Sequence, residues 1–308
     1  MTERLYLSDP YLTSFNARIV ERRHLPPDAR LAVILDRTAF SPAVAGVVAD
    51  RGTLAEAQVL DVYEDDQGYL LHVISQEVWR DDVQGRLDWS RRLDLMQHHT
   101  AQHILSEALF QTAGAETAAV YISPQAAWLE VSKAVSEADL DRAVAWANQL
   151  IASGRAVRTA SVDQARLGPL PGVAPGQAVR VFNIEGLRLK VCSAAHVSRT
   201  SEIGLLRIAR LDRVNGRMRI EFQCGARVLG DLQRRDQLVN RLAALVGAPA
   251  AELEQAVANL MAQARSATAT VTALCNKMIE YESMALEATA ERAGDVRPVS
   301  YTHLRAHE

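Results

Sequence analysis

Two histidines stand four residues apart in the stretch MQHHTAQHIL, residues 96–105. On a helix, side chains at i and i+4 project from one face about one turn apart, so His99 and His103 could bind one small cation. A second pair with the same spacing, Cys192 and His196, follows in KVCSAAHVS. Cysteine and histidine together select zinc over the hard cations, which prefer oxygen ligands. The spacing therefore favours one zinc site over four unrelated side chains.

A third pair, His303 and His307, repeats this spacing in the final stretch RPVSYTHLRAHE. That stretch breaks at Pro298, has no apolar periodicity and offers no cysteine partner, so we interpret residues 294–308 as a non-native tail. A zincin-type peptidase is not indicated either, because Thr100 stands where HExxH needs its glutamate. Glu107 lies one turn beyond His103 and could orient it, but we expect it to be an exposed helical glutamate.

The composition is that of an ordinary globular protein, with 48% hydrophobic and 23% charged residues in 308. Its apolar runs are much shorter than the ~20 residues that span a bilayer. The first residues show no secretion signal, and three cysteines are too few for a disulfide framework. We therefore expect a cytoplasmic protein.

The net charge of −3 is unevenly distributed. Residues 91–230 carry 17 basic and 12 acidic residues, whereas residues 1–90 carry 9 and 15. A basic region beside a candidate metal site suits a polyanion such as RNA. Solvated arginines on the outer face of strands would explain the same pattern equally well. The candidate RNA-binding residues are Arg207, Arg210 and Arg213.

The elements that must position these residues are both strands and helices. Residues 1–90 contain β-rich runs, with a hairpin turn expected at EDDQG. Residues 91–112 have a helical pattern that Gly114 would end, and Ser136 with Asp139 would cap a second amphipathic helix. Short strands return between 178 and 229. This mixture predicts an α+β fold.

Residues 230–292 have a different pattern, with long apolar-striped helices. The first would end at Gly247, and Pro249 suits the start of the next. We expect an antiparallel helical hairpin or a dimerisation arm, which would allow a homodimer through the C-terminal helices. Structural packing is a commoner use of such a stripe than recognition of another partner.

Together, MQHHTAQHIL and CSAAHVSRTSEIGLLRI resemble the paired zinc motifs of the alanyl-tRNA synthetase editing domain and of freestanding alanyl-tRNA editing proteins. The likeness extends to TERLYLSDPYLTSFNARIV, LDRTAFSP and RMRIEFQCGARVL, and so covers about residues 2–290. It implies a small β-barrel (1–90), an α/β editing core with the zinc site (91–229) and a helical arm (230–293). In that family the zinc lies in a pocket that accepts the aminoacyl end of a mischarged tRNA, and the ester is hydrolysed there.

The chain departs from the family at two loops near this expected pocket. Ala45-Gly46-Val47 replaces the usual Gly-Gly-Gln, and Ser193-Ala194-Ala195 replaces Gly-Gly-Thr between the ligands. Added Cβ atoms restrict how closely backbone and substrate approach. The candidate substrate-pocket residues are Gly46, Thr100, Ser193, Ala194 and Ala195.

The leading hypothesis is a trans-acting deacylase for seryl- or glycyl-tRNA of the alanine type, with zinc held by His99, His103, Cys192 and His196. No side chain is identified as the catalytic group, and a zinc-positioned water would attack the ester. Because four protein ligands are typical of a closed structural site, the ion could instead anchor the pocket. The alternative is a non-catalytic tRNA- or RNA-binding protein with a structural zinc. A hydrolase of some non-RNA ester has nothing specific in its favour.

Overall fold

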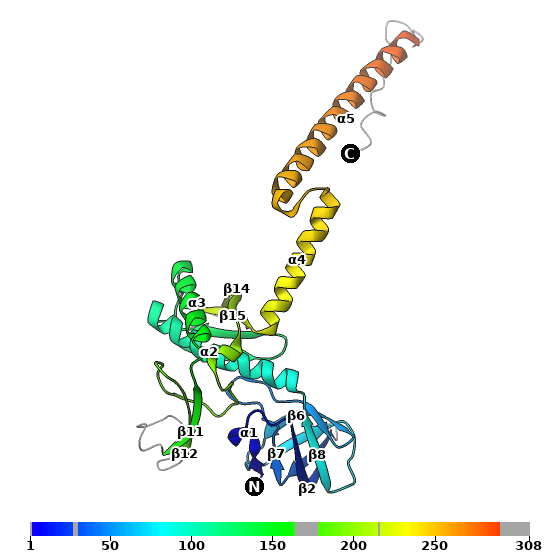
Figure 1. Ribbon diagram of the computed structural model, residues 1–308. Helices are drawn as coiled ribbons and strands as arrows, with labels where there is room; N and C mark the ends of the chain where they lie inside the picture. The colour runs from blue at the N-terminus through cyan, green and yellow to red at the C-terminus, as the bar shows by residue number, and fades with distance from the viewer. Residues whose placement is uncertain (1, 27–29, 164–177, 215, 290–308) are drawn as a thin grey trace. The chain divides into compact units, whose positions relative to one another are not determined.

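The computed structural model describes residues 2–26, 30–163, 178–214 and 216–289 (Figure 1). The chain divides into two compact units, Met1–Asp231 and Leu232–Glu308. The proposed non-native tail lies outside the described residues. No helix within the described ranges combines the length and apolar character that crossing a membrane requires.

A closed barrel of six antiparallel strands begins the first unit, in the order β2-β3-β7-β6-β5-β8. Alternate residues of a strand point to opposite faces, so Phe15, Ala17 and Ile19 enter the barrel core while their neighbours face solvent. The expected hairpin turn is confirmed between β6 and β7, where the Asp65 carboxylate accepts the backbone N–H groups of Gln67 and Tyr69. The barrel strands are β2 (Ser14–Leu25), β3 (Arg30–Leu35), β5 (Gly52–Leu54), β6 (Ala57–Glu64), β7 (Leu70–Ile74) and β8 (Asp82–Leu87).

A short segment precedes the barrel. It consists of β1 (Glu3–Arg4), which pairs in parallel with β4 (Arg37–Thr38), and the single-turn helix α1 (Leu5–Ser8). The α+β prediction with a small barrel in the first 90 residues is confirmed at this coarse level. The predicted domain boundaries at residues 90, 229 and 293 stay predictions.

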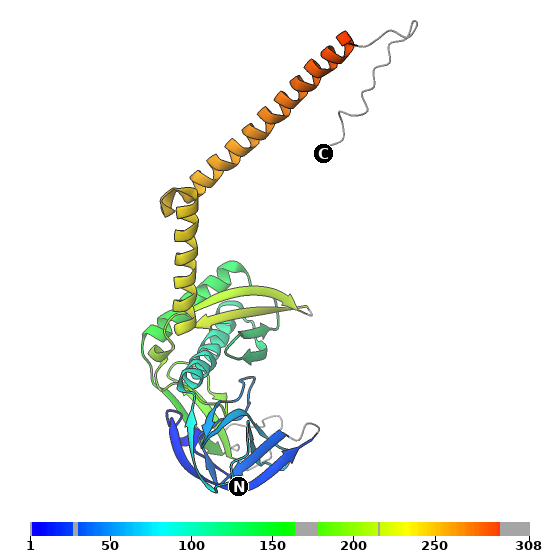
Figure 2. The same ribbon diagram turned by 90° about the vertical axis from the view of Figure 1, so that its right-hand side faces the viewer.

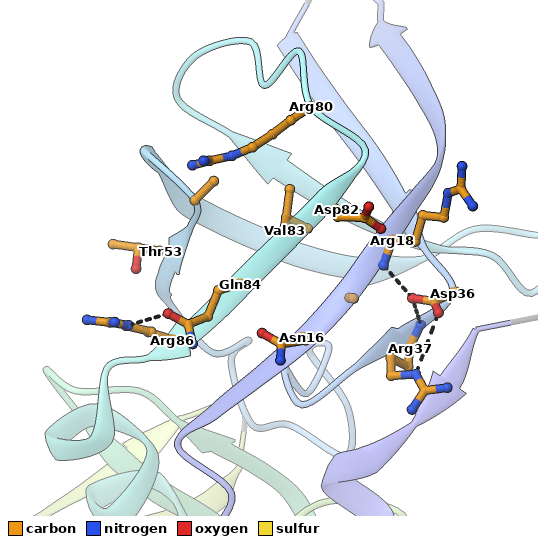
Figure 3. Close-up of a pocket in the computed structure, with 12 residues that line it drawn as sticks. Asn16, Arg18, Asp36, Arg37, Thr53, Arg80, Asp82, Val83, Gln84 and Arg86 are labelled. Carbon is orange, nitrogen blue, oxygen red and sulfur yellow. Dashed lines mark hydrogen bonds and ion pairs between the residues drawn. The ribbon is translucent and has the colours of Figure 1, made fainter.

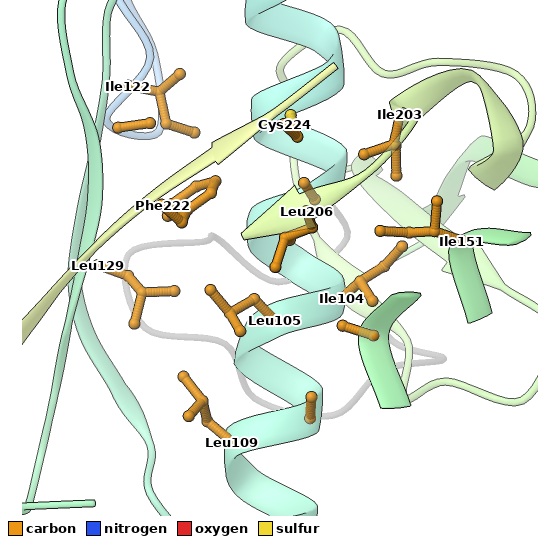
Figure 4. Packing of buried hydrophobic residues seen from close by; sticks show 14 of the residues in the cluster. Ile104, Leu105, Leu109, Ile122, Leu129, Ile151, Ile203, Leu206, Phe222 and Cys224 are labelled. Carbon is orange, nitrogen blue, oxygen red and sulfur yellow. The ribbon is translucent and has the colours of Figure 1, made fainter. Parts of the chain in front are cut away.

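The central element after the barrel is α2 (Trp89–Ala113), which carries the first histidine pair. The Asp88 carboxylate accepts the backbone N–H of Arg91 at its start, and Gly114 ends it in the left-handed conformation, as predicted. Buried residues occur on all sides of α2, so it is a core helix. Figure 4 shows this packing, in which Ile104, Leu105 and Leu109 of α2 contact a shared apolar cluster.

A four-stranded antiparallel sheet and a second helix enclose α2. The sheet has the order β14-β15-β10-β9, and the three-stranded sheet β11-β12-β13 lies nearby in the same unit. The predicted cap of the second helix is confirmed, because the Ser136 hydroxyl accepts the backbone N–H of Asp139. These elements are β9 (Thr117–Ile122), β10 (Ala127–Val131), α3 (Glu137–Ala152), β11 (Val157–Asp163), β12 (Ala178–Ile184), β13 (Lys190–Val191), the 3₁₀ helix η2 (Thr200–Ile203), β14 (Leu206–Val214) and β15 (Arg217–Cys224).

The last elements are helical. α4 (Ala226–Val246) ends before Gly247, which has a φ of +72°, as the sequence predicts. The 3₁₀ helix η3 (Ala250–Glu252) follows Pro249 and leads into α5 (Leu253–Thr289), a long continuous helix (Figure 2). Leu242 of α4 and Leu274 of α5 are both exposed. The apolar stripes are therefore not packed into a hairpin core within the described chain.

Candidate metal centre

The four residues of the two spaced pairs come together in one cluster. His99 and His103 project from α2, Cys192 follows β13, and His196 lies in the loop between β13 and η2. The ligand atoms of all four lie within 4.8 Å of one another. Cys192 Sγ is 3.4 Å from His99 Nε2, and the His99 and His196 rings stack with centroids 4.3 Å apart. The fold thus joins residues more than 90 positions apart into one candidate site.

The loop that carries Cys192 and His196 is fixed at both ends. At its start, the Cys192 N–H donates to the Arg180 carbonyl of β12 at 3.0 Å. Beyond His196, the Ser198 N–H donates to the Tyr11 hydroxyl oxygen at 2.7 Å, and the Ser198 hydroxyl donates to the Glu202 carboxylate at 2.6 Å. The N-terminal segment and η2 therefore hold the ligand loop against α2.

His99 is oriented by the backbone of this loop. Its Nδ1 lies 3.3 Å from the Ala195 carbonyl, which only accepts hydrogen bonds, so Nδ1 carries the proton. The lone pair is then on Nε2, the atom that faces Cys192. Burial lowers the pKa of His99 to about 4, so the ring is neutral near pH 7. A neutral imidazole with a free Nε2 is the form that binds a metal.

Thr100 orients the third histidine. Its hydroxyl donates to the Met96 carbonyl at 2.8 Å, so its oxygen must accept from His196 Nδ1 at 3.2 Å and from the Val197 N–H at 3.3 Å. These bonds use the one donor and both acceptor positions of the hydroxyl. Thr100 is fully buried. It therefore contributes to the cluster by fixing His196, and its predicted contact with substrate stays a prediction.

Two ring nitrogens in the cluster have no partner within the described residues. They are His103 Nε2 and His196 Nε2, both buried. Burial also lowers the pKa of each ring well below its usual value, and the neighbouring His99 adds to the effect. Buried polar atoms are normally hydrogen-bonded, so two unpaired nitrogens beside a thiol and a third imidazole fit a bound ion. The three-histidine, one-cysteine donor set suits zinc.

The thiolate form of Cys192 must be stabilised if this residue is to bind a metal. Burial raises the pKa of its thiol to about 11, while the backbone N–H of Ala194 and the charge of Arg180 act in the opposite direction. Metal binding must therefore displace the thiol proton. Arg180 has a buried Nη1 without a hydrogen-bond partner among the described residues. Its positive charge favours the thiolate, a role that the sequence did not reveal.

Phe182 is a second residue that sequence reasoning missed. Its ring stacks on His103 at 4.6 Å between centroids and lies 4.1 Å from His196. Phe182 comes from β12, in which Val179, Val181 and Ile184 are also buried. Both faces of this strand are thus covered, and no alternation in the sequence singles out the residue that contacts the histidines.

The substituted ligand loop closes against the loop that precedes β5. Ala194 and Ala195 line a cavity of about 20 Å³ together with Val47, Val48 and Met96, whereas Ser193 is exposed. This volume holds about one water molecule. The two loops therefore meet, but the space between them is too small for an aminoacyl group as it stands.

Gly46 has a structural reason to be glycine. Its φ is +80°, and a Cβ at this position would lie 2.3 Å from the Val120 carbonyl oxygen. Its own carbonyl accepts the Ile122 N–H of β9 at 2.8 Å. Gly46 thus joins the loop to the core sheet, and it does not line the small cavity. Its assignment to the substrate pocket stays a prediction.

Glu107 corrects one expectation. It is only 3% exposed, and its carboxylate accepts from Arg188 Nε at 2.8 Å and from Gln111 Nε2 at 3.1 Å. The Arg188 guanidinium also lies over the Phe110 ring, 3.7 Å from its centroid. The expected exposed glutamate is therefore a buried partner of an arginine, because the segment after α3 folds back over α2.

The three candidate RNA-binding arginines lie on β14 but do not share a face. Arg207 is opposite Gln223 and Arg210 opposite Glu221, two positions apart on β15, whereas Arg213 is opposite Met218. Arg207 pairs with Asp231 at 2.6 Å, and Arg210 pairs with Asp212 at 3.0 Å. Arg213 has no ion pair within the described residues. RNA contact by these arginines stays a prediction.

A much larger cavity, of about 910 Å³, lies on the outside of the barrel (Figure 3). None of the four cluster residues lines it. Several of its arginines pair with carboxylates, as with Arg80 and Glu56 at 2.5 Å or Arg37 and Asp36 at 3.5 Å, whereas Arg86 donates to Gln84. The described lining residues include no histidine or cysteine, so the His–Cys cluster is the candidate metal site.

Comparison with known proteins yields two kinds of relative. No protein-family profile matches the chain. It is 27% identical over 313 residues to the alanine–tRNA ligase of Pyrococcus furiosus, covering 96% of this chain and 34% of the ligase. The ligase of Ignicoccus hospitalis is 28% identical over 255 residues, covering 77% and 28%. The alanyl-tRNA editing protein AlaX-L of Pyrococcus horikoshii is 31% identical over 249 residues, covering 75% and 60%.

The chain thus spans about a third of the length of the ligases and 60% of the editing protein. The resemblance expected from the paired His and Cys–His motifs is confirmed, and those motifs meet in one cluster. The chain belongs to the family that alanyl-tRNA editing proteins share with alanyl-tRNA synthetases.

Proposed function

We propose that this protein is a zinc-dependent aminoacyl-tRNA deacylase that removes serine or glycine from mischarged alanine tRNA. The observation that carries the proposal is the cluster of His99, His103, Cys192 and His196, with unpaired ring nitrogens inside it. A relative named as an alanyl-tRNA editing protein supports the substrate class. Hydrolysis would consume one water per ester, breaking the acyl carbon–oxygen bond and returning the ribose hydroxyl to the tRNA.

The cluster residues and their neighbours would have separate roles in this reaction. The four cluster residues would hold the ion, and a zinc ion bound there would supply a Lewis acid that polarises the ester carbonyl. The Ala195 carbonyl and the Thr100 hydroxyl fix the tautomers of His99 and His196. His103 is the ligand that is partly exposed, and Lys190 places a positive charge near it. Substrate would therefore approach from the side of His103.

One observation favours a second candidate, a non-catalytic tRNA- or RNA-binding protein with a structural zinc. The cavity beside Ala194 and Ala195 has a volume of only about 20 Å³, and four protein ligands are typical of a closed site. Under the deacylase proposal, the loops around Val47 and Ala194 must separate when substrate binds.

The deciding experiment incubates the zinc-loaded protein with seryl-, glycyl- and alanyl-tRNA of the alanine type and follows ester loss. The deacylase proposal requires that the protein hydrolyse the seryl or glycyl ester faster than the alanyl ester. It also requires that the His103→Ala variant hydrolyse none of these esters faster than the rate without protein. Tight tRNA binding without turnover of any ester would favour the second candidate. Replacing Ser193-Ala194-Ala195 by Gly-Gly-Thr should change the ratio of seryl to glycyl hydrolysis if this loop lines the aminoacyl pocket.

A further inference from the structure

A cleft of about 300 Å³ opens beside the turn that joins β9 and β10. It is bounded by this turn, by β6 and by the start of α2, all within the first unit. None of the four cluster residues lines it. The lining side chains that bear on its chemistry are Arg51, Asp61, Arg91, Tyr121 and Gln125.

Two arginines line this cleft, and the nearby carboxylates of Asp50, Asp88 and Asp94 partly offset the charge of Arg91. Arg91 donates from Nε and Nη2 to one neutral acceptor, the Ala49 carbonyl, at 3.1 and 2.8 Å. Neighbouring Arg92 and Arg227 pair with Asp50 and Asp94, but neither Arg51 nor Arg91 forms an ion pair within the described residues. Arginine side chains that form no direct ion pair are a ready site for an anion.

The two guanidinium groups are close enough to repel each other. Burial lowers the pKa of Arg91 and the charge of Arg51 lowers it further, whereas the charges of Asp50, Asp88 and Asp94 raise it. Asp61 also lines the cleft, but its carboxylate already accepts the Val62 backbone N–H at 2.9 Å. An anion between the arginines would relieve their repulsion.

Tyr121 adds a flat apolar surface beside these charges. Its side chain is 39% exposed, and its ring stacks on Trp128 with centroids 5.7 Å apart and an interplanar angle of 27°. The Arg219 guanidinium lies over the Trp128 ring at 4.0 Å. This stack holds Tyr121 in place, so its ring presents a preorganised platform. A base stacked on an aromatic ring, next to arginines on the backbone, is the usual way to bind an unpaired nucleotide.

We propose that this cleft binds one unpaired nucleotide of an RNA strand, with its phosphate between Arg51 and Arg91 and its base on Tyr121. The cleft volume suits a ligand of about this size. The inference rests on the proposed RNA partner but does not require ester hydrolysis. It gives the protein an RNA contact distinct from the β14 arginines, which are largely paired.

The test titrates the intact protein into a fluorescein-labelled, unstructured RNA oligonucleotide that carries no amino acid. Arg51→Gln/Arg91→Gln should weaken binding at least about tenfold and reduce the log–log salt slope by about 0.7, the value for one phosphate. Tyr121→Leu should weaken binding by about 5- to 150-fold, and Tyr121→Phe should retain it. The matched control is Arg37→Gln/Arg80→Gln, whose arginines are ion-paired on the barrel.

Unchanged affinity in both test variants would overturn the proposal. So would displacement of the oligonucleotide by inorganic phosphate as effectively as by a nucleoside monophosphate, because the site would then bind phosphate alone. Since the probe has no ester, a protein that fails as a deacylase can still confirm this cleft. Conversely, a protein that hydrolyses the ester could still show no binding at this cleft, which would refute the cleft proposal alone.

Discussion

The hydroxyl oxygen of Thr100 accepts a hydrogen bond from Nδ1 of His196 at 3.2 Å, because its own proton is committed to the Met96 carbonyl. Thr100, the neighbour of His99 in the chain, thus sets the tautomer of His196, 96 positions away. The relationship leaves His196 Nε2 free inside the cluster, where the chain offers it no partner within the described residues.

Replacing Thr100 by valine should therefore weaken zinc binding while keeping the side-chain shape. We expect a loss of about 10- to 100-fold in zinc affinity, the usual effect of removing a group that orients a metal-bound histidine. Competition with a zinc chelator measures it. Thr112→Val is the matched control, since Thr112 makes the same bond to the carbonyl four residues earlier on α2, away from the cluster. Equal affinity in the two variants would contradict this role.

Removing a ligand should have a larger effect. His103→Ala and Cys192→Ala should each lose most of the bound metal, expected at about one zinc per chain, and should lower the melting temperature because metal binding is coupled to folding. His303→Ala/His307→Ala should retain the full metal content. Elemental analysis after dialysis measures the zinc content of each variant. Loss of zinc in the tail variant would mean that His303 and His307 bind the metal.

Gly46→Ala should destabilise the protein more than Gly216→Ala. Both glycines have a φ near +80°, so each alanine variant costs about 1–2 kcal/mol of backbone strain. Only Gly46 would place its Cβ 2.3 Å from a carbonyl oxygen, whereas Gly216 has open space. That close approach adds about 1–3 kcal/mol of overpacking. Urea unfolding of the two variants measures the difference, and equal midpoints would refute the close approach to β9.

Neutralising Arg207, Arg210 and Arg213 together should weaken tRNA binding and flatten its salt dependence. The log–log slope should change by about 0.7–0.9 for each phosphate that an arginine no longer neutralises. Because Arg207 and Arg210 already pair with carboxylates, we expect most of the change from Arg213→Gln alone. Filter binding across a salt series provides the slopes. If the triple variant keeps the parent slope, these arginines belong to a solvated face.

His72 should make the stability of the protein sensitive to acid. Burial in the barrel lowers its pKa to about 4, against an ordinary 6.5 in the unfolded chain. The unfolded state therefore binds the proton first as the pH falls below 6.5, and about 3 kcal/mol of stability is lost by pH 4. His72→Gln should show a shallower loss of stability between pH 7 and pH 5. His24→Gln, at an exposed position, should follow the parent protein in the same unfolding experiment.

Local sequence signals predicted the elements well. The helix start and stop signals at Ser136, Gly114 and Gly247 lie where the helices begin or end, since a cap depends on neighbouring residues alone. The two spaced pairs also identified the cluster, because a ligand must be a particular residue type. The prediction that Glu107 is exposed was wrong because it relied on local sequence alone. Its burial depends on Arg188, some 80 residues later, and no local pattern reveals such a long-range pairing.

The sequence by itself identified the four side chains that could hold a metal ion, and it determined the periodicity of the barrel strands. Only the tertiary structure decided how those ligands are held. Phe182 stacks on His103, Ala195 orients His99, and Arg51 and Arg91 meet Tyr121 at one cleft. These relationships join segments distant in the chain. Residue type and spacing indicate which chemistry a side chain can perform. The packing of sheets against helices decides which side chains lie close together.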